Sequence, residues 1–425
     1  MKVFKFGGAS VKDAEAVKNV AEIIRMYQGE SLAVVVSAMG KTTNAFEKLH
    51  RAFFLKEGDA NQQLQEIKDF HFQILEGLFP DSKHKVYQEI HNTFVEVEWQ
   101  LEDDPIGTFD FEYDQMVSLG EMLSTKIISA YLLEVGISNK WLDARDVIRT
   151  DNHYRKAYVD WELSNSLIKK VMGGFFEKEE GGIMITQGFI AATSENYTST
   201  LGREGSDFSA AIIASALQAE EVVIWKDVEG MLNADPKYFE KTVKLNNISY
   251  REAVELAYFG ASVIHPKTIK PLHNANIPLY VKSFVNPSNR GSLIDANTDS
   301  DSLVPSYIHK PGQILISIAS KDYAFIAENN LSDIYRVFSE HGVSINMMQN
   351  SAISFSVCVD DESPKVDKLI KALQEHFLVT YNKSVELLTI RHYTEDIIEE
   401  LLSGKSNLLE QKSRNTARFV LKKIS

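Results

Sequence analysis

The sequence predicts an α/β protein with a mainly parallel central sheet covered by helices, followed by a smaller α+β portion. Near the N-terminus, Val3–Phe6 and Leu32–Val36 are short apolar runs separated by apolar residues at helical spacing. A strand, a helix and a strand in this order form a unit that places the two strands parallel. Leu32–Val36 is apolar on both faces, which is typical of a central strand covered on both sides. After Pro305 the pattern changes to short strands and helices in closer alternation.

Residues 1–305 are predicted to form one domain around this sheet. The helix after the first strand has Ser10 or Asp13 as its candidate N-cap. Residues 44–102 are rich in Glu, Gln, Lys, Phe and Leu and contain few Gly or Pro, so they predict two or three amphipathic helices inserted beside the sheet. Further strands are expected at 182–186, 222–225 and 278–282, and further helices at 116–133, 209–217 and 250–257.

Residues 306–425 are predicted to form a βαββαβ module and a partial second copy of it. The spacing from Gly342 to Gln349 equals the spacing from Gly404 to Gln411. The second copy ends without its last helix and strand, so we expect its sheet to leave an edge that a partner could cover. The strands are expected at 314–319, 345–348, 353–359, near 378, and at 387–391, 408–410 and 417–421, and the helices at 331–340, 365–376 and 395–402.

The composition excludes some classes of function. A formal net charge of −14 argues against non-specific nucleic-acid binding, which needs a basic face. Cys358 is the only cysteine of the 425 residues, so no internal disulfide can form and a reducing compartment is expected. The N-terminus begins at once with a strand, unlike a signal peptide, and no apolar run approaches the roughly 20 residues of a membrane span. We therefore expect a soluble, cytoplasmic protein.

Lys5, Gly7 and Gly8 suggest a phosphate site at the end of the first strand. Glycines after a buried strand let backbone N–H groups approach an anion at a helix N-terminus. A tight strand-to-helix turn would explain the glycines equally well. A tight turn does not explain a lysine inside an apolar strand. A buried ammonium group needs a partner, and a phosphate supplies one.

Arg203 and Asp207 lie four residues apart on a Gly/Ser-rich loop that enters a helix. A guanidinium group can bind a carboxylate through two hydrogen bonds, and a carboxylate suits an ammonium group, so the pair suits the charged ends of an amino acid. The alternative is a simple helix entry capped by Ser206 or Asp207, with Arg203 solvated. Glu121 lies in a helix-forming segment, where an exposed carboxylate is the commoner case.

Asp227-Val228-Glu229-Gly230 follows a predicted buried strand, and 235–237 comes soon after it. Loops at the carboxyl ends of parallel strands are where α/β folds bind ligands. The alternative is a turn made of residues that favour turns.

Taken together, these segments resemble the aspartate kinases of the amino-acid kinase superfamily. Lys5–Ser10 is similar to the family's Lys-Phe-Gly-Gly-Thr-Ser, and Ser118–Ser124 to its Ser-x-Gly-Glu-x-x-Ser. Thr198–Asp207 is similar to its Thr-Thr-Leu-Gly-Arg-Gly-Gly-Ser-Asp. Further similar blocks are Thr186–Phe189, Ile224–Pro236 and Glu255–Pro266.

The resemblance implies an amino-acid kinase fold for residues 1–305 and the phosphorylation of the side-chain carboxylate of L-aspartate by ATP with Mg²⁺. It implies no protein residue as a metal ligand. The implied catalytic residues are Lys5 and Asp207, and the substrate-binding residues are Ser37, Thr43, Glu121, Arg203 and Ser206. The implied ATP-binding residues are Lys5, Gly7, Gly8, Lys226, Asp227 and Lys237.

Four positions depart from the family pattern. Ala9 stands where threonine is usual, Glu204 where glycine is usual, and Lys226 where a small polar residue is usual. Ser262 takes the place of a lysine associated with ATP. We expect Lys226 or Lys237 to supply the missing positive charge.

The C-terminal portion, with its truncated second copy, resembles the paired ACT modules that give these enzymes feedback control. The resemblance implies a homodimer joined through residues after about Pro305 and an amino-acid effector near 343–354, with Asn346 and Gln349 as contacts. Lysine, threonine or neither could be the effector, and an ACT pair that only dimerises is the alternative. For the whole chain the alternative is a non-catalytic amino-acid sensor, whereas a kinase of glutamate or a nucleotide fits the Arg203–Asp207 loop less well.

Overall fold

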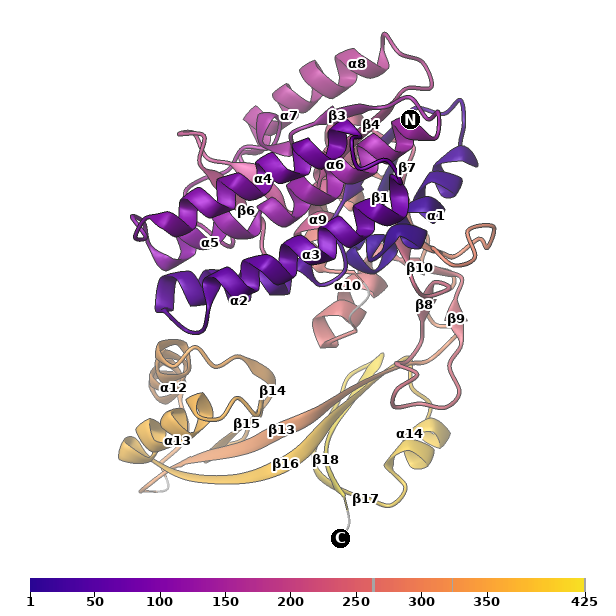
Figure 1. Cartoon of the computed structure of the whole chain (residues 1–425). Helices are drawn as coiled ribbons and strands as arrows, with labels where there is room; N and C mark the ends of the chain where they lie inside the picture. Colours follow the sequence, from indigo (N-terminus) through magenta and orange to yellow (C-terminus); the bar gives the residue numbers. More distant parts are fainter. Residues whose placement is uncertain (262–263, 323, 424–425) are drawn as a thin grey trace. The chain divides into compact units, whose positions relative to one another are not determined.

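The computed structural model describes residues 1–261, 264–322 and 324–423, and the chain forms two compact units (Figure 1). The first unit contains the N-terminal sheet, and the second contains the C-terminal sheet. Two short segments that precede residue 299 belong to the second unit. The first unit consists of Met1–Met231, Lys244–Val254 and Val263–Thr298, and the second of Leu232–Val243, Glu255–Ser262 and Asp299–Ser425.

An eight-stranded sheet forms the centre of the first unit, in the order β10-β12-β11-β7-β1-β2-β4-β3. Every neighbouring pair is parallel except β11 and β12, which confirms the predicted mainly parallel sheet. The strands are β1 (Lys2–Phe6), β2 (Leu32–Val36), β3 (Lys140–Leu142), β4 (Ile183–Gln187), β7 (Glu221–Lys226), β10 (Asn247–Ser249), β11 (Leu279–Ser283) and β12 (Ser292–Asp295). Because β1 lies between β2 and β7, the carboxyl ends of these three strands meet at one edge of the sheet.

Helices flank this sheet, and segment 44–102 forms three of them, α2, α3 and α4. Asp13 is the N-cap of α1, since its Oδ1 accepts a hydrogen bond from the Ala16 amide at 2.8 Å. The helices are α1 (Ala14–Arg25), α2 (Thr42–Leu55), α3 (Ala60–Leu78), α4 (Lys85–Glu102), α5 (Phe109–Val117), α6 (Leu119–Glu134), α7 (Trp161–Ile168), α8 (Gly174–Phe176), α9 (Gly205–Leu217), α10 (Tyr250–Phe259) and α11 (Pro266–Ala275). Shorter elements are η1 (Gly8–Val11), η2 (Ala144–Asp146), a π-helical turn at Lys169–Gly173, and β5 (Ile190–Ala192), β6 (Thr198–Thr200), β8 (Met231–Leu232) and β9 (Lys244–Leu245).

The main core of the first unit lies between the sheet and helices α1 to α6. Phe6 and Trp225 stack in it with ring centroids 6.0 Å apart. The stretch Phe109–Glu134, which contains α5 and α6, is long and apolar enough to cross a membrane by length and composition, although no such run was expected from the sequence. Because 83% of its most apolar window is buried in the fold, it has the burial of a core helix.

The second unit contains a six-stranded antiparallel sheet in the order β14-β15-β13-β16-β18-β17. Helices α12 and α13 cover the apolar side chains of β13 and β15, and α14 packs on β16 and β18. The elements are β13 (Ser306–Ser320), α12 (Glu328–Glu340), β14 (Ile345–Asn350), β15 (Ser354–Asp360), α13 (Lys365–His376), β16 (Phe377–Arg391), α14 (Glu395–Leu402), β17 (Lys405–Lys412) and β18 (Thr416–Lys423).

The shortened second module has the predicted sheet edge, at β17, but it does not lack a fourth strand. Its fourth strand position is filled by the beginning of β13, because Ser306–Lys310 pairs with Leu387–Arg391. The remainder of β13 pairs with the first part of β16 and belongs to the first module. Two long strands therefore run through both modules, and the sheet ends at β14 and β17.

Candidate active site

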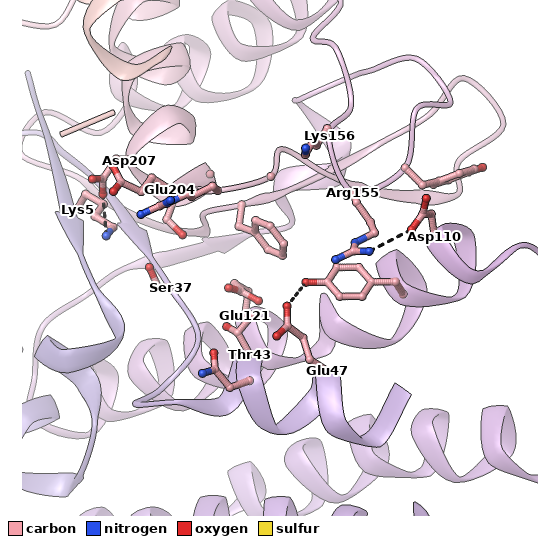
Figure 2. Close-up of a pocket in the computed structure, with 18 of the residues that line it drawn as sticks. Lys5, Ser37, Thr43, Glu47, Asp110, Glu121, Arg155, Lys156, Glu204 and Asp207 are labelled. Atoms are coloured by element: carbon pink, nitrogen blue, oxygen red, sulfur yellow. Dashed lines mark hydrogen bonds and ion pairs between the residues drawn. The ribbon is translucent and has the colours of Figure 1, made fainter. Parts of the chain in front are cut away.

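A cavity of about 850 Å³ lies in the first unit, at the edge where the loops after β1, β2, β4 and β7 meet (Figure 2). Side chains from α2, α5, α6 and α9 complete its wall. The cavity brings together eight of the residues that the sequence singled out, namely Lys5, Ser37, Thr43, Glu121, Arg203, Ser206, Asp207 and Lys226.

Lys5 and Asp207 form a buried ion pair at one end of the cavity. Lys5 Nζ lies 2.7 Å from Asp207 Oδ1, and Lys226 Nζ lies 3.9 Å from Asp207 Oδ2. Helix α9 begins at Gly205, and its N-cap Glu204 makes no side-chain cap hydrogen bond. Neither Ser206 nor Asp207 is the N-cap, and Asp207 faces two lysines, although Arg203 is exposed as a simple helix entry would have it.

Gly8 is required by a close approach of two loops. A Cβ atom at this position would lie 2.6 Å from the carbonyl oxygen of Gly40 and 3.0 Å from that of Ala38. The Gly40 amide also donates a hydrogen bond to the Gly8 carbonyl at 3.0 Å. At Gly7, a Cβ atom would lie 3.2 Å from Lys5 Nζ. Gly7 thus keeps the space beside the Lys5 ammonium group free of side-chain atoms, and Gly8 lets the two loops meet.

Glu121 is a buried carboxyl group in the middle of the cavity wall (Figure 2). Its Oε1 accepts a hydrogen bond from the Ala38 amide at 3.2 Å, and its Oε2 has no hydrogen-bond partner in the part of the chain that the structure describes. Burial raises the pKa of Glu121 to about 8, against the opposing effect of the Ala38 amide and the Lys5 charge. A buried acceptor that faces the cavity in this way suits a ligand with an ammonium group.

Hydrogen bonds behind the cavity hold α6 in place. The Thr125 hydroxyl donates to the Glu121 carbonyl at 2.9 Å and accepts from Gln187 Nε2 at 2.7 Å. The Ser124 hydroxyl donates to the Ser37 carbonyl at 2.7 Å. These bonds join the helix that carries Glu121 to the ends of β2 and β4.

The far wall of the cavity was missed by the sequence analysis. The Tyr113 hydroxyl donates to Glu47 Oε1 at 2.6 Å, and the Arg155 guanidinium lies 4.3 Å from the centre of the Tyr113 ring (Figure 2). Arg155 also pairs with Asp110 at 3.2 Å. Lys156 lines the same wall. The only signal in the sequence was a basic dipeptide in a polar stretch, which is usually solvated.

Several predicted site residues lie elsewhere. Asp227 is exposed on the loop after β7 and does not line this cavity, and Lys237 is exposed in the second unit. Ser262 lies outside the described residues. Gln349 is exposed on β14, whereas the side chain of Asn346 accepts a hydrogen bond from Lys310 Nζ at 3.1 Å and donates one to Gln313 at 2.9 Å.

Comparison with known proteins agrees with this fold. The model of the amino acid kinase family matches residues 1–283. Lysine-sensitive aspartokinase 3 of Escherichia coli is 31% identical over 84% of this chain and 78% of its own length. The chain therefore belongs to the amino acid kinase family, in its aspartokinase branch.

Solved structures give the same assignment. E. coli aspartokinase III in complex with lysine and aspartate (T-state) has a TM-score of 0.83 and 26% identity, and the match covers 99% of this chain and 95% of that one. The same enzyme with aspartate and ADP (R-state) has a TM-score of 0.82 and 26% identity over 99% and 96% of the two chains. The predicted amino-acid kinase fold with C-terminal ACT-like modules is confirmed.

Proposed function

We propose that this chain is an aspartate kinase that transfers the γ-phosphoryl group of ATP to the side-chain carboxylate of L-aspartate. The product is 4-phospho-L-aspartate, which begins the route to lysine, threonine and methionine. The observation that carries the proposal is one cavity that contains both the Lys5–Asp207 ion pair and the unpaired Glu121 carboxyl oxygen. The first of these suits the phosphate, and the second suits the amino group of the substrate.

The amino-acid end of the substrate is assigned to two charged side chains, and three hydroxyl side chains complete its pocket. Glu121 accepts hydrogen bonds from the ammonium group, and the exposed guanidinium of Arg203 binds the α-carboxylate through two hydrogen bonds. Ser37, Thr43 and Ser206 line the space between them. The side-chain carboxylate is already ionised near neutral pH, so it can attack phosphorus without a general base.

The remaining task of the site is alignment and charge stabilisation. Lys5 holds the phosphates, and Lys226 adds a second positive charge. Gly7 and Gly8 do not line this cavity, so contact of their backbone amides with the phosphates stays a prediction. Asp207 keeps the Lys5 ammonium group in position until the phosphoryl group approaches it. That Asp227 and Lys237 contact the nucleotide stays a prediction.

Magnesium would reach this site with the nucleotide. Within residues 1–261, 264–322 and 324–423, no group of three or more His, Cys, Asp or Glu side chains could hold a metal ion. Mg²⁺ commonly binds through one or two carboxylates together with substrate phosphates, and Asp207 beside Lys5 fits that role. The ion would neutralise charge on the phosphates.

The test is release of ADP on addition of L-aspartate to purified protein with ATP and magnesium, and trapping of the acyl phosphate by hydroxylamine. L-Glutamate is the control. Binding of aspartate without ADP release would instead support the alternative, a non-catalytic amino-acid sensor.

Feedback control by an amino acid through the second unit follows from the same assignment. The E. coli structure with lysine supports an amino-acid effector. Because the Asn346 amide is engaged by Lys310 and Gln313, an effector would meet Gln349 and neighbouring backbone first. Titration calorimetry with lysine and threonine, alone and together, decides between them, and binding of neither would indicate a purely structural ACT pair.

We also propose that the protein is located in the cytoplasm.

A further inference from the structure

Asp114 on α5 is a fully buried carboxylate that holds two distant segments of the chain. Its Oδ2 accepts hydrogen bonds from the Arg155 amide at 2.9 Å and the Thr200 amide at 2.8 Å. Its Oδ1 accepts one from the Thr200 hydroxyl at 2.7 Å. All three donors lie more than 40 positions away in the sequence.

The two segments held by Asp114 carry the arginines of the cavity. Arg155 lines its far wall, and Thr200 ends the strand that leads three residues later to Arg203. The Ala157 amide donates to the Thr200 carbonyl at 3.0 Å, so the segments are also joined directly. Asp114 itself does not line the cavity.

The backbone at Arg155 needs such a restraint. Its φ is +65°, a left-handed conformation that is unfavourable for a residue with a side chain and persists only where its surroundings fix it. The Asp114 carboxylate fixes the amide of this residue, while the Tyr113 ring and Asp110 hold its guanidinium. The direction in which Arg155 enters the cavity therefore depends on Asp114.

We propose that Asp114 is a positioning residue that sets the affinity of the cavity for a dicarboxylic amino acid by fixing the segments of Arg155 and Arg203. It acts through these segments and touches no substrate atom. The inference rests on the proposed function for the identity of the ligand.

Protonation of Asp114 would leave these hydrogen bonds in place. Burial raises the pKa of this carboxyl to about 6, opposed by the three hydrogen bonds and by the Arg155 charge. Tyr113 on its own helix and Tyr154 beside Arg155 are the other titratable groups near it, and both stay neutral in this pH range. When the carboxyl is protonated, one oxygen still accepts from both backbone amides and the new hydroxyl can donate to the Thr200 hydroxyl, so the two segments stay held below about pH 6.

The variants are Asp114→Ala, which removes both acceptor oxygens and so all three hydrogen bonds, and Asp114→Asn. In the asparagine variant the amide oxygen can accept from both backbone amides, and the Thr200 hydroxyl can accept from the NH₂ group. Glu112→Ala is the matched control, because Glu112 lies on the same helix and accepts the amides of Ile106 and Gly107 at 3.0 and 2.8 Å, in a loop outside the cavity.

The measurements are KM for aspartate and for ATP between about pH 5.5 and 8, and amide hydrogen exchange of residues 153–158 and 198–204. Asp114→Ala should raise the KM for aspartate about tenfold or more and change the KM for ATP little. The backbone amides of both segments should lose protection from hydrogen exchange in this variant. Asp114→Asn should bind aspartate nearly as well as the wild type throughout this pH range, because its amide oxygen can still accept from both backbone amides.

Glu112→Ala should lower the melting temperature and leave the aspartate KM unchanged. The proposal is overturned if Asp114→Ala raises the KM for aspartate no more than Glu112→Ala does, or if it raises the KM for ATP and the KM for aspartate equally. Failure of the proposed function would show separately, as wild-type protein without ADP release. In that case the aspartate Kd from calorimetry replaces KM in the same comparison.

Discussion

Lys5 Nζ and Asp207 Oδ1 lie 2.7 Å apart. Lys5 stands near the end of the central strand β1, and Asp207 stands in the first turn of helix α9, which begins 200 residues after Lys5. Both side chains are almost fully buried, so each depends on the other in the absence of substrate. A phosphate that approaches Lys5 would compete with Asp207 for the same ammonium group.

Replacement of Lys5 tests this competition. Lys5→Ala should lower kcat at least about a hundredfold, because its charge matters most as charge redistributes on the phosphoryl group. It should also destabilise the fold, since it leaves the buried Asp207 carboxylate with only the more distant Lys226 as a countercharge. Denaturant unfolding of both single variants and of Lys5→Ala/Asp207→Ala checks the pairing. If the double variant is as unstable as the sum of the singles, the two residues are not coupled.

Arg203 should matter for aspartate far more than for ATP. Loss of two charge-assisted hydrogen bonds in Arg203→Ala should raise the aspartate KM about 10- to 100-fold with a small effect on the ATP KM. Arg203→Lys is the control, because it keeps the charge but removes the planar fork, and should be intermediate. Equal changes in the KM of both substrates would contradict the assignment of Arg203 to the α-carboxylate.

Glu121 should couple aspartate binding to proton release. Its carboxyl is protonated in much of the free protein at neutral pH, because burial raises its pKa to about 8, and a bound ammonium group favours the ionised form. Calorimetry at about pH 7 in two buffers of different ionisation enthalpy should show this release. Glu121→Gln should abolish it and weaken aspartate binding. Identical heats in both buffers for the wild type would show that Glu121 is already ionised.

The same group predicts how stability depends on pH. The folded protein holds this proton more tightly than the unfolded chain, whose carboxyl has the usual pKa of 4.5. The contribution of Glu121 to stability is therefore largest below about pH 4.5 and is lost as the pH rises towards 8. Urea unfolding of the wild type and of Glu121→Gln across this range should differ in slope, with the variant the flatter of the two.

Lys226 is the better candidate to replace the positive charge missing at Ser262. It lines the cavity beside Asp207, whereas Lys237 belongs to the second unit. Lys226→Ala should raise the ATP KM about three- to tenfold, as expected for one partly exposed charge, with Lys237→Ala as the comparison. If neither variant weakens the use of ATP, compensation by these lysines is wrong, and Ser262→Lys becomes the informative change.

Assembly should depend on the second unit. We predict a homodimer at micromolar concentration, joined through residues after about Pro305, because strands β14 and β17 leave the sheet with two edges. Sedimentation equilibrium checks the mass, and truncation after Pro305 should give a monomeric first unit. A fully active monomer of the whole chain would contradict the prediction.

The sequence predicted much of this site because parallel strands bring their carboxyl ends together. Lys5, Ser37 and Lys226 stand at the ends of three adjacent strands, so the order of strands and helices was enough to expect them in one place. The sequence indicated less clearly that Glu121 belongs to the site. A carboxylate on a helix can be exposed or buried, and only the packing of the helix decides that Glu121 is buried.

Two features could not be predicted from local patterns. Asp114 bonds to Arg155 and Thr200 at separations of 41 and 86 residues, and no periodicity of apolar residues records such contacts. Lys310-Pro311-Gly312 has the composition of a turn, so the strand was expected to begin after it. In the structure this tripeptide is an irregularity inside β13, with a shift of register between Lys310 and Gln313.

The two long strands make the regulatory modules a single folding unit. A cut near Gly312 would separate Ser306–Lys310, the strand that completes the sheet of the second module, from its continuation in the first module. The core around Leu388 and Phe419 would then lose Tyr307, which packs against it. The two modules also share a cluster in which Leu315 and Cys358 pack with Leu387 and Val420, so melting of one module exposes apolar side chains of the other. A ligand that stabilises one end of β13 or β16 should raise the unfolding temperature of the whole sheet, as one cooperative transition.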